Sequence, residues 1–228
     1  MALAVDASTP AFVKGTTNPA TTASFSPPAN AMLVAFCIAD ETNTFVVANS
    51  GTVLSWSQVD FTNPSGFNSG AVWVAFTTSA PGSITVSSTK TGSFTANAVK
   101  VVVITGAETS FTGAHNKTTN AATLSLTATA TGSWVWDAFG NQGGGTTDAA
   151  ATGCTYNDAE SAFGGVSGGI IRRTTADGVS GSGSAVGIAT HNFSETHVAI
   201  EIKPSSGGSV IIPQQVRLTQ AVVRSSFY

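Results

Sequence analysis

The amino-acid sequence predicts an all-β protein: an antiparallel, jelly-roll-like β-sandwich with an extended C-terminal arm. Apolar and polar residues alternate with a period of two in many short runs, and turn residues separate these runs roughly every 8–12 positions. No segment shows a convincing amphipathic-helix period. Charged residues make up only 9% of the 228 residues, against ~25% in an average domain. Ser, Thr and Gly must therefore cover much of the surface.

Two of the expected strands, Ala31–Ala39 and Asn97–Thr105, are apolar on both faces. Such strands lie at the centre of a sheet and are covered on both sides. One face would meet the facing sheet, and the other needs a loop, a further layer or another protein chain. The other expected strands are Thr21–Phe25, Thr44–Val47, Thr52–Phe61, Ala71–Thr78, Ser83–Ser88, Ala122–Ala128, Ser133–Phe139, Gly169–Thr175, Ala185–Thr190 and a last strand around Val198–Ile202.

The last expected strand has alternating positions that differ in polarity. The set Val198, Ile200 and Ile202 predicts a buried face, and the set Ala199, Glu201 and Lys203 predicts a face in water. Upstream, Asp158–Ala162 is expected to form one short helical turn. The Gly-rich stretch from Gly140 to Gly187 is expected to hold long loops or short strands.

Two short segments repeat faintly along the chain. Thr91-Gly92-Ser93-Phe94 recurs as Thr131-Gly132-Ser133-Trp134, and Leu33-Val34-Ala35-Phe36 is similar to Trp136-Asp137-Ala138-Phe139. Two similar halves would suit a jelly roll built from two Greek keys.

A boundary is expected after Pro204. Residues 1–204 form the sandwich body, 205–209 are a Gly/Ser linker by composition, and 210–228 form an arm with two arginines and no acidic residue. The arm is too apolar for a solvated tail, so it is interpreted either as a docking arm that binds a neighbouring chain or as a strand added to its own domain. The residues expected to bind a partner are Val210, Ile212, Val216, Arg217, Leu218, Val222, Phe227 and Tyr228.

Several classes of partner are excluded by composition. The formal net charge of −3 leaves no basic patch for nucleic acid, and the apolar runs are too short to span a bilayer. No signal peptide is recognised, so synthesis in a cytoplasm is expected. No cofactor motif is recognised either, and no cofactor is expected. Cys37 lies in an apolar strand pattern and is interpreted as a buried hydrophobe, and a disulfide with Cys154 is the less favoured alternative.

Trp134 and Trp136 are the candidate ligand-binding residues. They share one face of an expected strand, and aromatic rings can stack on sugars. Most tryptophans of a sandwich belong to the core, so the preferred interpretation of this pair is core packing, and a sugar platform is the alternative.

No catalytic or metal-binding residue is predicted. Gly165-Val166-Ser167-Gly168-Gly169 matches the spacing of a nucleophile elbow, but no helix pattern follows it. His191, Glu195 and His197 could hold a divalent metal, yet the solvated face of the last strand explains them more simply. Asp158 and Glu160 are interpreted as a solvated loop. The chain is therefore not expected to be an enzyme.

A resemblance to a family rests on five stretches of apolar strand pattern. They are Phe25-Ser26-Pro27-Pro28-Ala29-Asn30-Ala31-Met32-Leu33-Val34, Leu54-Ser55-Trp56, Val72-Trp73-Val74-Ala75, Val101-Val102-Val103-Ile104-Thr105-Gly106-Ala107 and Gly132-Ser133-Trp134-Val135-Trp136. The first resembles the opening strand of β-sandwich minor structural proteins from tailed phages of actinobacteria, and Met32 departs from that pattern. The resemblance covers roughly residues 1–204 and supplies no catalytic residue.

That resemblance implies a non-enzymatic structural component of a phage virion, either a minor tail protein or a capsid-decoration protein. The expected partners are other virion proteins, copies of the chain itself and a host surface glycan, and the expected location is the virion after synthesis in the host cytoplasm. The alternative function is that of a carbohydrate-binding module for a cell-wall polysaccharide.

Overall fold

The computed structural model describes residues 1–92, 96–142, 149–163, 166–174, 183–189 and 194–206. Every regular element in these ranges is a β-strand, which confirms the all-β prediction. No helix in the same ranges could cross a membrane.

The first half of the chain contains nine strands: β1 (Ala4–Val5), β2 (Val13–Gly15), β3 (Ala20–Thr21), β4 (Ala31–Ala39), β5 (Phe45–Asn49), β6 (Ser57–Thr62), β7 (Ser69–Phe76), β8 (Val86–Lys90) and β9 (Asn97–Thr105). The described part of the second half contains seven strands: β10 (His115–Thr119), β11 (Thr123–Thr127), β12 (Trp134–Gln142), β13 (Cys154–Phe163), β14 (Val166–Arg173), β15 (Gly183–Gly187) and β16 (Ser194–Ile202).

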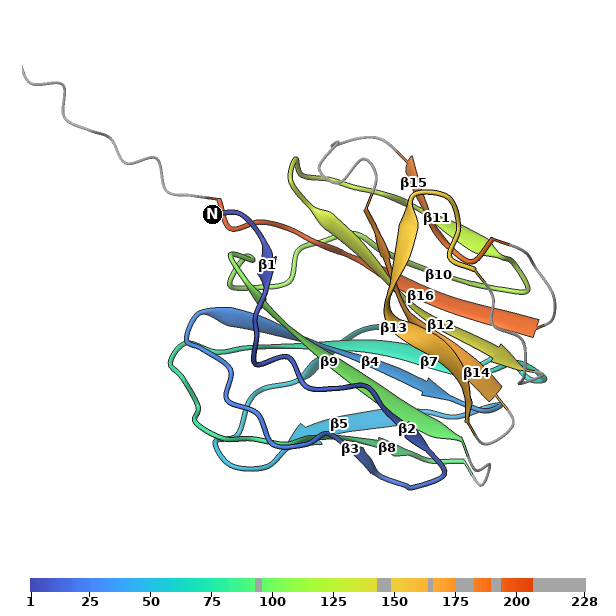
Figure 1. The fold of residues 1–228 in the computed structure, drawn as a ribbon, viewed down its shortest axis with the longest axis horizontal. Coiled ribbons are helices and arrows are strands. Elements are labelled where there is room, and N and C mark those ends of the chain that lie inside the picture. The colour runs from blue at the N-terminus through green and yellow to red at the C-terminus, as the bar shows by residue number, and fades with distance from the viewer. Residues whose placement is uncertain (93–95, 143–148, 164–165, 175–182, 190–193, 207–228) are drawn as a thin grey trace, which may run out of the picture.

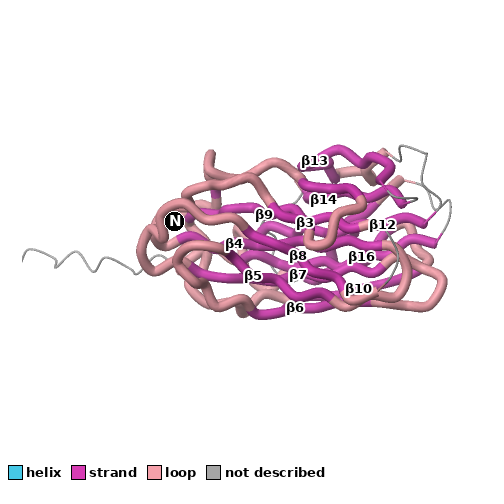
Figure 2. Tube along the Cα trace, turned by 90° about the horizontal axis from the view of Figure 1, so that it is seen from below, coloured by secondary structure: helices cyan, strands magenta, loops and turns pink. Residues whose placement is uncertain are grey.

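These strands form four antiparallel sheets stacked as four layers (Figure 1). Two large sheets, β1-β9-β4-β7-β6 and β10-β16-β12-β14-β13, face each other in the middle, and β2 also pairs with β9. The small sheet β3-β8-β5 covers the outer face of the first large sheet, and β11-β15 covers that of the second. Figure 2 shows the strands of overlapping layers running in similar directions. Packed antiparallel sheets confirm the sandwich prediction.

The two halves pair their strands in the same order. β10, β11, β12, β13, β14, β15 and β16 occupy the positions of β1, β3, β4, β6, β7, β8 and β9. In each half the first strand therefore pairs with the last, and the large sheet ends on the equivalent edge strand, β6 or β13. At the position equivalent to β5, the described residues hold a single antiparallel bridge, Ala150 with Ile188, at the end of β15. The body thus consists of two similarly connected units packed through their large sheets.

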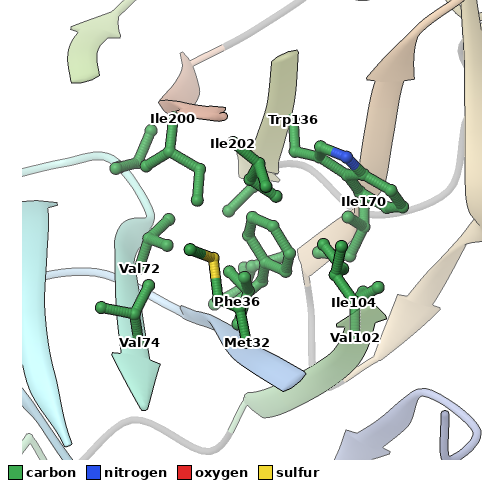
Figure 3. Packing of buried hydrophobic residues seen from close by; sticks show 14 of the residues in the cluster. Met32, Phe36, Val72, Val74, Val102, Ile104, Trp136, Ile170, Ile200 and Ile202 are labelled. Carbon is green, nitrogen blue, oxygen red and sulfur yellow. The ribbon is translucent and has the colours of Figure 1, made fainter. Parts of the chain in front are cut away.

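The largest core cluster lies between the two large sheets (Figure 3). Met32 and Phe36 of β4 meet Trp136 of β12 and Ile200 of β16, and the Phe36 and Trp136 rings stack with their centroids 6.1 Å apart. Each apolar side chain of this size contributes roughly 1.5–3 kcal/mol when it is fully buried. This cluster is therefore the main apolar contact between the halves.

The outer faces of the large sheets form two further cores. Leu33 of β4 and Val101 of β9 pack on the first small sheet, while Phe139 of β12 and Ile171 of β14 pack on the second. The prediction that Ala31–Ala39 and Asn97–Thr105 are covered on both faces is confirmed. Of the alternatives, a further layer of the same chain supplies the second cover.

The repeat seen in the sequence does not coincide with the structural one. It equates Phe36 with Phe139, which do lie on the equivalent strands β4 and β12. However, Phe36 points between the large sheets and Phe139 points away from them. A shift of one residue exchanges the faces of a strand, so this match is out of register. Thr91-Gly92 precedes β9 and Thr131-Gly132 precedes β12, which are not equivalent strands.

Several expectations for the second half were wrong. The last strand has no face in water, because Ala199 and Glu201 are as fully buried as Val198 and Ile200. The small sheet and the loops around it cover that face. Residues 158–162 lie within strand β13 instead of forming a helical turn.

The Gly-rich stretch contains strands of 8 to 10 residues, β13 and β14, where long loops or short strands were expected. A Cβ atom on Gly140 or Gly168 would lie within 2.9 Å of Ile38 Cγ2 or 2.6 Å of Phe139 O, respectively. These glycines therefore permit close packing of neighbouring strands and sheets rather than marking turns.

Cys37 and Cys154 are both free thiols, so the less favoured disulfide does not form. Cys37 packs in the outer core of the first half and Cys154 beside that of the second. Burial raises the pKa of the Cys37 thiol to about 12, which keeps it protonated and inert, as expected for a buried hydrophobe.

Candidate functional site: a cleft at the edge of the two large sheets

Strand β6 forms one edge of the first large sheet and contains a β-bulge. Its register against β7 shifts between Gln58 and Asp60, which makes Val59 an extra residue. Asp60 consequently pairs with Val72, whose side chain points toward the second half. In a regular strand Asp60 would lie opposite Ala71 and point toward the small sheet. The bulge therefore turns Asp60 toward the second half.

Asp60 is joined there to two residues of β10. His115 Nδ1 donates to Asp60 Oδ2 at 2.8 Å, and Lys117 Nζ donates to Asp60 Oδ1 at 2.9 Å and to the Phe61 carbonyl at 2.8 Å. Partial burial acts to raise the pKa of Asp60, but the hydrogen bonds from His115 and Lys117 outweigh it and hold the pKa below its usual value. The cluster links the edges of the two halves.

A cleft of about 410 Å³ opens beside this cluster. Its walls come from β6, from β7, from the segment that connects the two halves and from the first residue of β10. The lining residues are Ser57, Gln58, Val59, Val74, Phe76, Thr109, Ser110, Phe111 and His115. Since Asp60 fixes Nδ1 of His115, the other ring nitrogen is the one available for a hydrogen bond in the cleft.

A second hollow, of about 250 Å³, shares Phe76 with this cleft. Its other lining residues are Thr52, Val53, Leu54, Ser55, Thr77, Thr78, Ser79 and Pro81. Phe76 and Phe111 are half-buried and also pack against the core between the large sheets. The half-buried Phe76 is therefore part of the wall of both hollows.

The tryptophan pair does not form an exposed platform. Trp136 is fully buried in the core between the large sheets. Trp134 is half-buried, and the guanidinium carbon of Arg172 lies 3.6 Å from its ring centroid. Trp136 is therefore a core residue, as the preferred interpretation of the pair has it, and its ring is not exposed for the alternative sugar platform.

Glu195 and His197 lie on one face of β16, but that face is buried rather than solvated. His197 Nδ1 donates to Asp137 Oδ2 at 2.6 Å, and both side chains are fully buried. His191 lies outside the described residues. Within the described ranges no group of three His, Cys, Asp or Glu residues is arranged to hold a metal ion.

Ser167 and Asp158 both lie on strands. Ser167 is buried near the start of β14 and is followed by strand rather than helix, so no nucleophile elbow is formed. Asp158 lies on β13 and pairs with Lys100 of β9 at 2.7 Å. It is therefore not part of a solvated loop, and it links the halves at the edge opposite Asp60. The side chain of Glu160 is not among those that the structure describes.

The cleft was missed from the sequence because its residues come from four separate segments. His115 and Lys117 begin a polar strand, β10, that lacks the apolar alternation used to find strands. The residues predicted to bind a partner, from Val210 to Tyr228, lie outside the described residues.

No protein-family model matches the chain, and neither a curated protein nor a solved structure does.

Proposed function

We propose that this protein is a non-enzymatic structural component of a tailed-phage virion, a minor tail or capsid-decoration protein that attaches to neighbouring subunits. The proposal starts from the strand pattern around Phe25–Val34, which resembles such proteins. Residues 31–34 of that pattern form the start of β4, the central strand of the first large sheet.

The observation that carries the proposal is the connectivity of the two halves. For comparison with known folds, the strands of the first half are renumbered 1 to 8 in chain order, leaving out β2. The large sheet then has the order 1-8-3-6, with strand 5 beside strand 6, and the small sheet has the order 2-7-4. The first order and most of the second are those of a jelly roll, an architecture of viral capsid and lectin domains. The second half repeats this order as far as it is described. We therefore infer two tandem jelly rolls, and the step to a virion is an argument from fold analogy.

The start of the linker lies beside the N-terminus. The Met1 amino group lies 3.3 Å from the Ser205 carbonyl oxygen, and the Ser205 amide donates to the Gly106 carbonyl at 2.7 Å. Ser205, the first linker residue, is therefore held beside the N-terminus. We propose that residues 210–228 add to an exposed strand edge of a neighbouring virion protein or of another copy.

Particle composition tests this proposal. Purified particles of the phage that encodes the chain should contain it in a fixed ratio to the major capsid protein, as measured by quantitative mass spectrometry, with density for the two stacked units in a cryo-EM map. A chain that stays in the soluble fraction of the lysate and is missing from the particles would refute the structural role.

Deletion of residues 205–228 tests the arm. The truncated body should nearly keep its melting temperature, because among the described residues the deletion removes only the hydrogen bonds of Ser205 with Gly106 and Met1, yet it should no longer enter particles in a complementation assay. A melting temperature lower by many degrees would show instead that the arm is a strand of the body itself.

A further inference from the structure

The cleft beside β6 is suited to a ligand that is neutral. None of its nine lining residues is Asp, Glu, Lys or Arg, and the same holds for the second hollow. Asp60 and Lys117 lie next to the cleft but neutralise each other at 2.9 Å. A phosphate, a nucleotide or a charged peptide would lose its hydration without gaining an opposite charge. The lining therefore disfavours ionic ligands.

The same lining disfavours a purely apolar ligand. Ser57, Gln58, Thr109 and Ser110 are exposed at the cleft, and a hydrocarbon placed there would take their polar groups from water without offering hydrogen bonds. Four apolar side chains, among them Phe76 and Phe111, nevertheless form part of the wall. A ligand that suits both must combine apolar patches with many neutral hydroxyl groups.

A sugar ring has this combination, because its C–H face packs on aromatic rings while its hydroxyls exchange hydrogen bonds with Ser, Thr, Gln and His. A hollow of about 410 Å³ falls within the ~300–1,000 Å³ typical of small-molecule sites. His115 is held by Asp60, so its free ring nitrogen is already oriented. Such preorganisation lowers the cost of binding.

We propose that the two hollows that share Phe76 form a binding site for a neutral oligosaccharide, with one sugar ring in the cleft of Phe111 and His115 and a neighbouring ring in the second hollow. This goes beyond the structural role and does not depend on it. It also relocates the sugar site from Trp134 and Trp136 to the edge of the large sheets.

Titration of the ¹⁵N-labelled chain with neutral saccharides tests this site. The probes are D-glucose, D-galactose, D-mannose and D-arabinose, together with their dimers and trimers. At least one series should shift the backbone amides of residues 109–111 and His115 in a saturable way. The dimer or trimer should bind more tightly than the matching monosaccharide, because it fills both hollows.

Two substitutions test the proposed sugar site in different ways. Phe111→Ala removes a stacking surface, and Ser110→Trp adds bulk to the cleft at an exposed position without removing a core contact. Each should weaken binding roughly tenfold or more. Phe12→Ala and Ser65→Trp are the matched controls, since Phe12 packs on the same core, Ser65 is an exposed serine and neither residue lines a hollow. Both controls should bind as the parent chain does.

The proposal is overturned if none of the saccharides shifts these amides, or if binding persists unchanged in Ser110→Trp. It is equally overturned if the shifts map to Trp134 and its neighbours instead. Incorporation into particles is a separate measurement, so failure of the sugar site and failure of the structural role are distinguishable.

Discussion

Glu201 shows how much a single buried side chain can organise in this protein. Its carboxylate is fully buried and accepts hydrogen bonds from the amides of Ala114, Thr129 and Ala130 and from the hydroxyls of Thr129 and Ser133, at 2.6–3.0 Å. Burial acts to raise the pKa of Glu201, but these hydrogen bonds, led by the one from Ala114, outweigh it, and the pKa lies below its usual value. Glu201 therefore ties two loops to the last strand.

Replacement Glu201→Gln should lower the free energy of unfolding by roughly 3 kcal/mol, because an amide brings its own N–H groups toward donors and carries no charge. Urea denaturation at neutral pH measures this. Glu108→Gln is the control, since the Glu108 carboxylate accepts hydrogen bonds from the Thr112 amide and hydroxyl at the surface, and it should cost less than about 1 kcal/mol.

The same carboxylate predicts a direction of pH dependence. A group whose pKa is lower in the folded state contributes stability above its unfolded value, ~4.3 for Glu, and loses it as the pH falls through the folded value. Asp60 acts in the same sense. Stability should therefore fall below about pH 4, and the fall should be shallower in Glu201→Gln. If the free energy of unfolding fell in the same way with decreasing pH in the parent protein and in Glu201→Gln, Glu201 would not have a lowered pKa in the folded state.

Trp136 is the largest fully buried side chain and stacks on Phe36 between the two large sheets. Trp136→Ala should lower the free energy of unfolding by about 3–5 kcal/mol through the lost contacts and the remaining cavity. Trp134→Ala, at a half-buried neighbour, should cost clearly less. Near-normal stability of Trp136→Ala in thermal or urea melts would mean that the two large sheets do not pack as described.

Two ion pairs that differ in burial join the halves, one on each side of the large sheets. On one side Asp158 pairs with Lys100, whose side chain is only 6% exposed and whose Nζ also donates to the Pro10 carbonyl at 2.8 Å. On the other side Asp60 pairs with Lys117, which is 47% exposed. A charge left alone is costly when buried and cheap when hydrated.

Asp158→Asn should therefore destabilise the protein by roughly 2–4 kcal/mol, because Lys100 would remain charged in a buried position. Asp60→Asn removes an equivalent contact with an exposed lysine and should cost less than about 1 kcal/mol. Equal costs in parallel urea melts would argue against the burial of Lys100.

Each hydrophobic core of the molecule lies between two sheets, so neighbouring sheets depend on each other for the burial of their apolar faces. The largest apolar cluster takes side chains from both large sheets, so neither half can keep its inner face covered when the other unfolds. The chain should consequently unfold in one cooperative transition despite its two similar units. Differential scanning calorimetry tests this: calorimetric and van't Hoff enthalpies should agree, and two resolved transitions would show independent halves.

Much of the fold was predictable from the alternation of apolar and polar residues with a period of two. Ala31–Ala39 and Asn97–Thr105 were bounded correctly because strong apolar runs between turn residues leave no other interpretation. β10 and β13 were missed, since polar edge strands are set by their neighbours and not by their own alternation. The predicted two-faced burial of the central strands followed from composition alone.

The candidate site depended on contacts between distant segments. Phe76 and His115 were unremarkable in the sequence, and only the bulge at Val59 brings Asp60 to the same side as His115. No local pattern predicts such a bulge, because it is stabilised by the partner strands rather than by the inserted residue.

Local alternation therefore determined that the chain is built of strands, which of them are central and that both of their faces are buried, because a side chain's polarity records whether it meets water. Tertiary structure decided what covers those faces, that a second unit of the same connectivity packs against the first, and that Glu201 and Asp137 are buried with partners. The reason is physical: a carboxylate in water and a carboxylate satisfied by buried donors are the same letter in a sequence, and only the donors, which come from strands and loops remote in the chain, tell them apart.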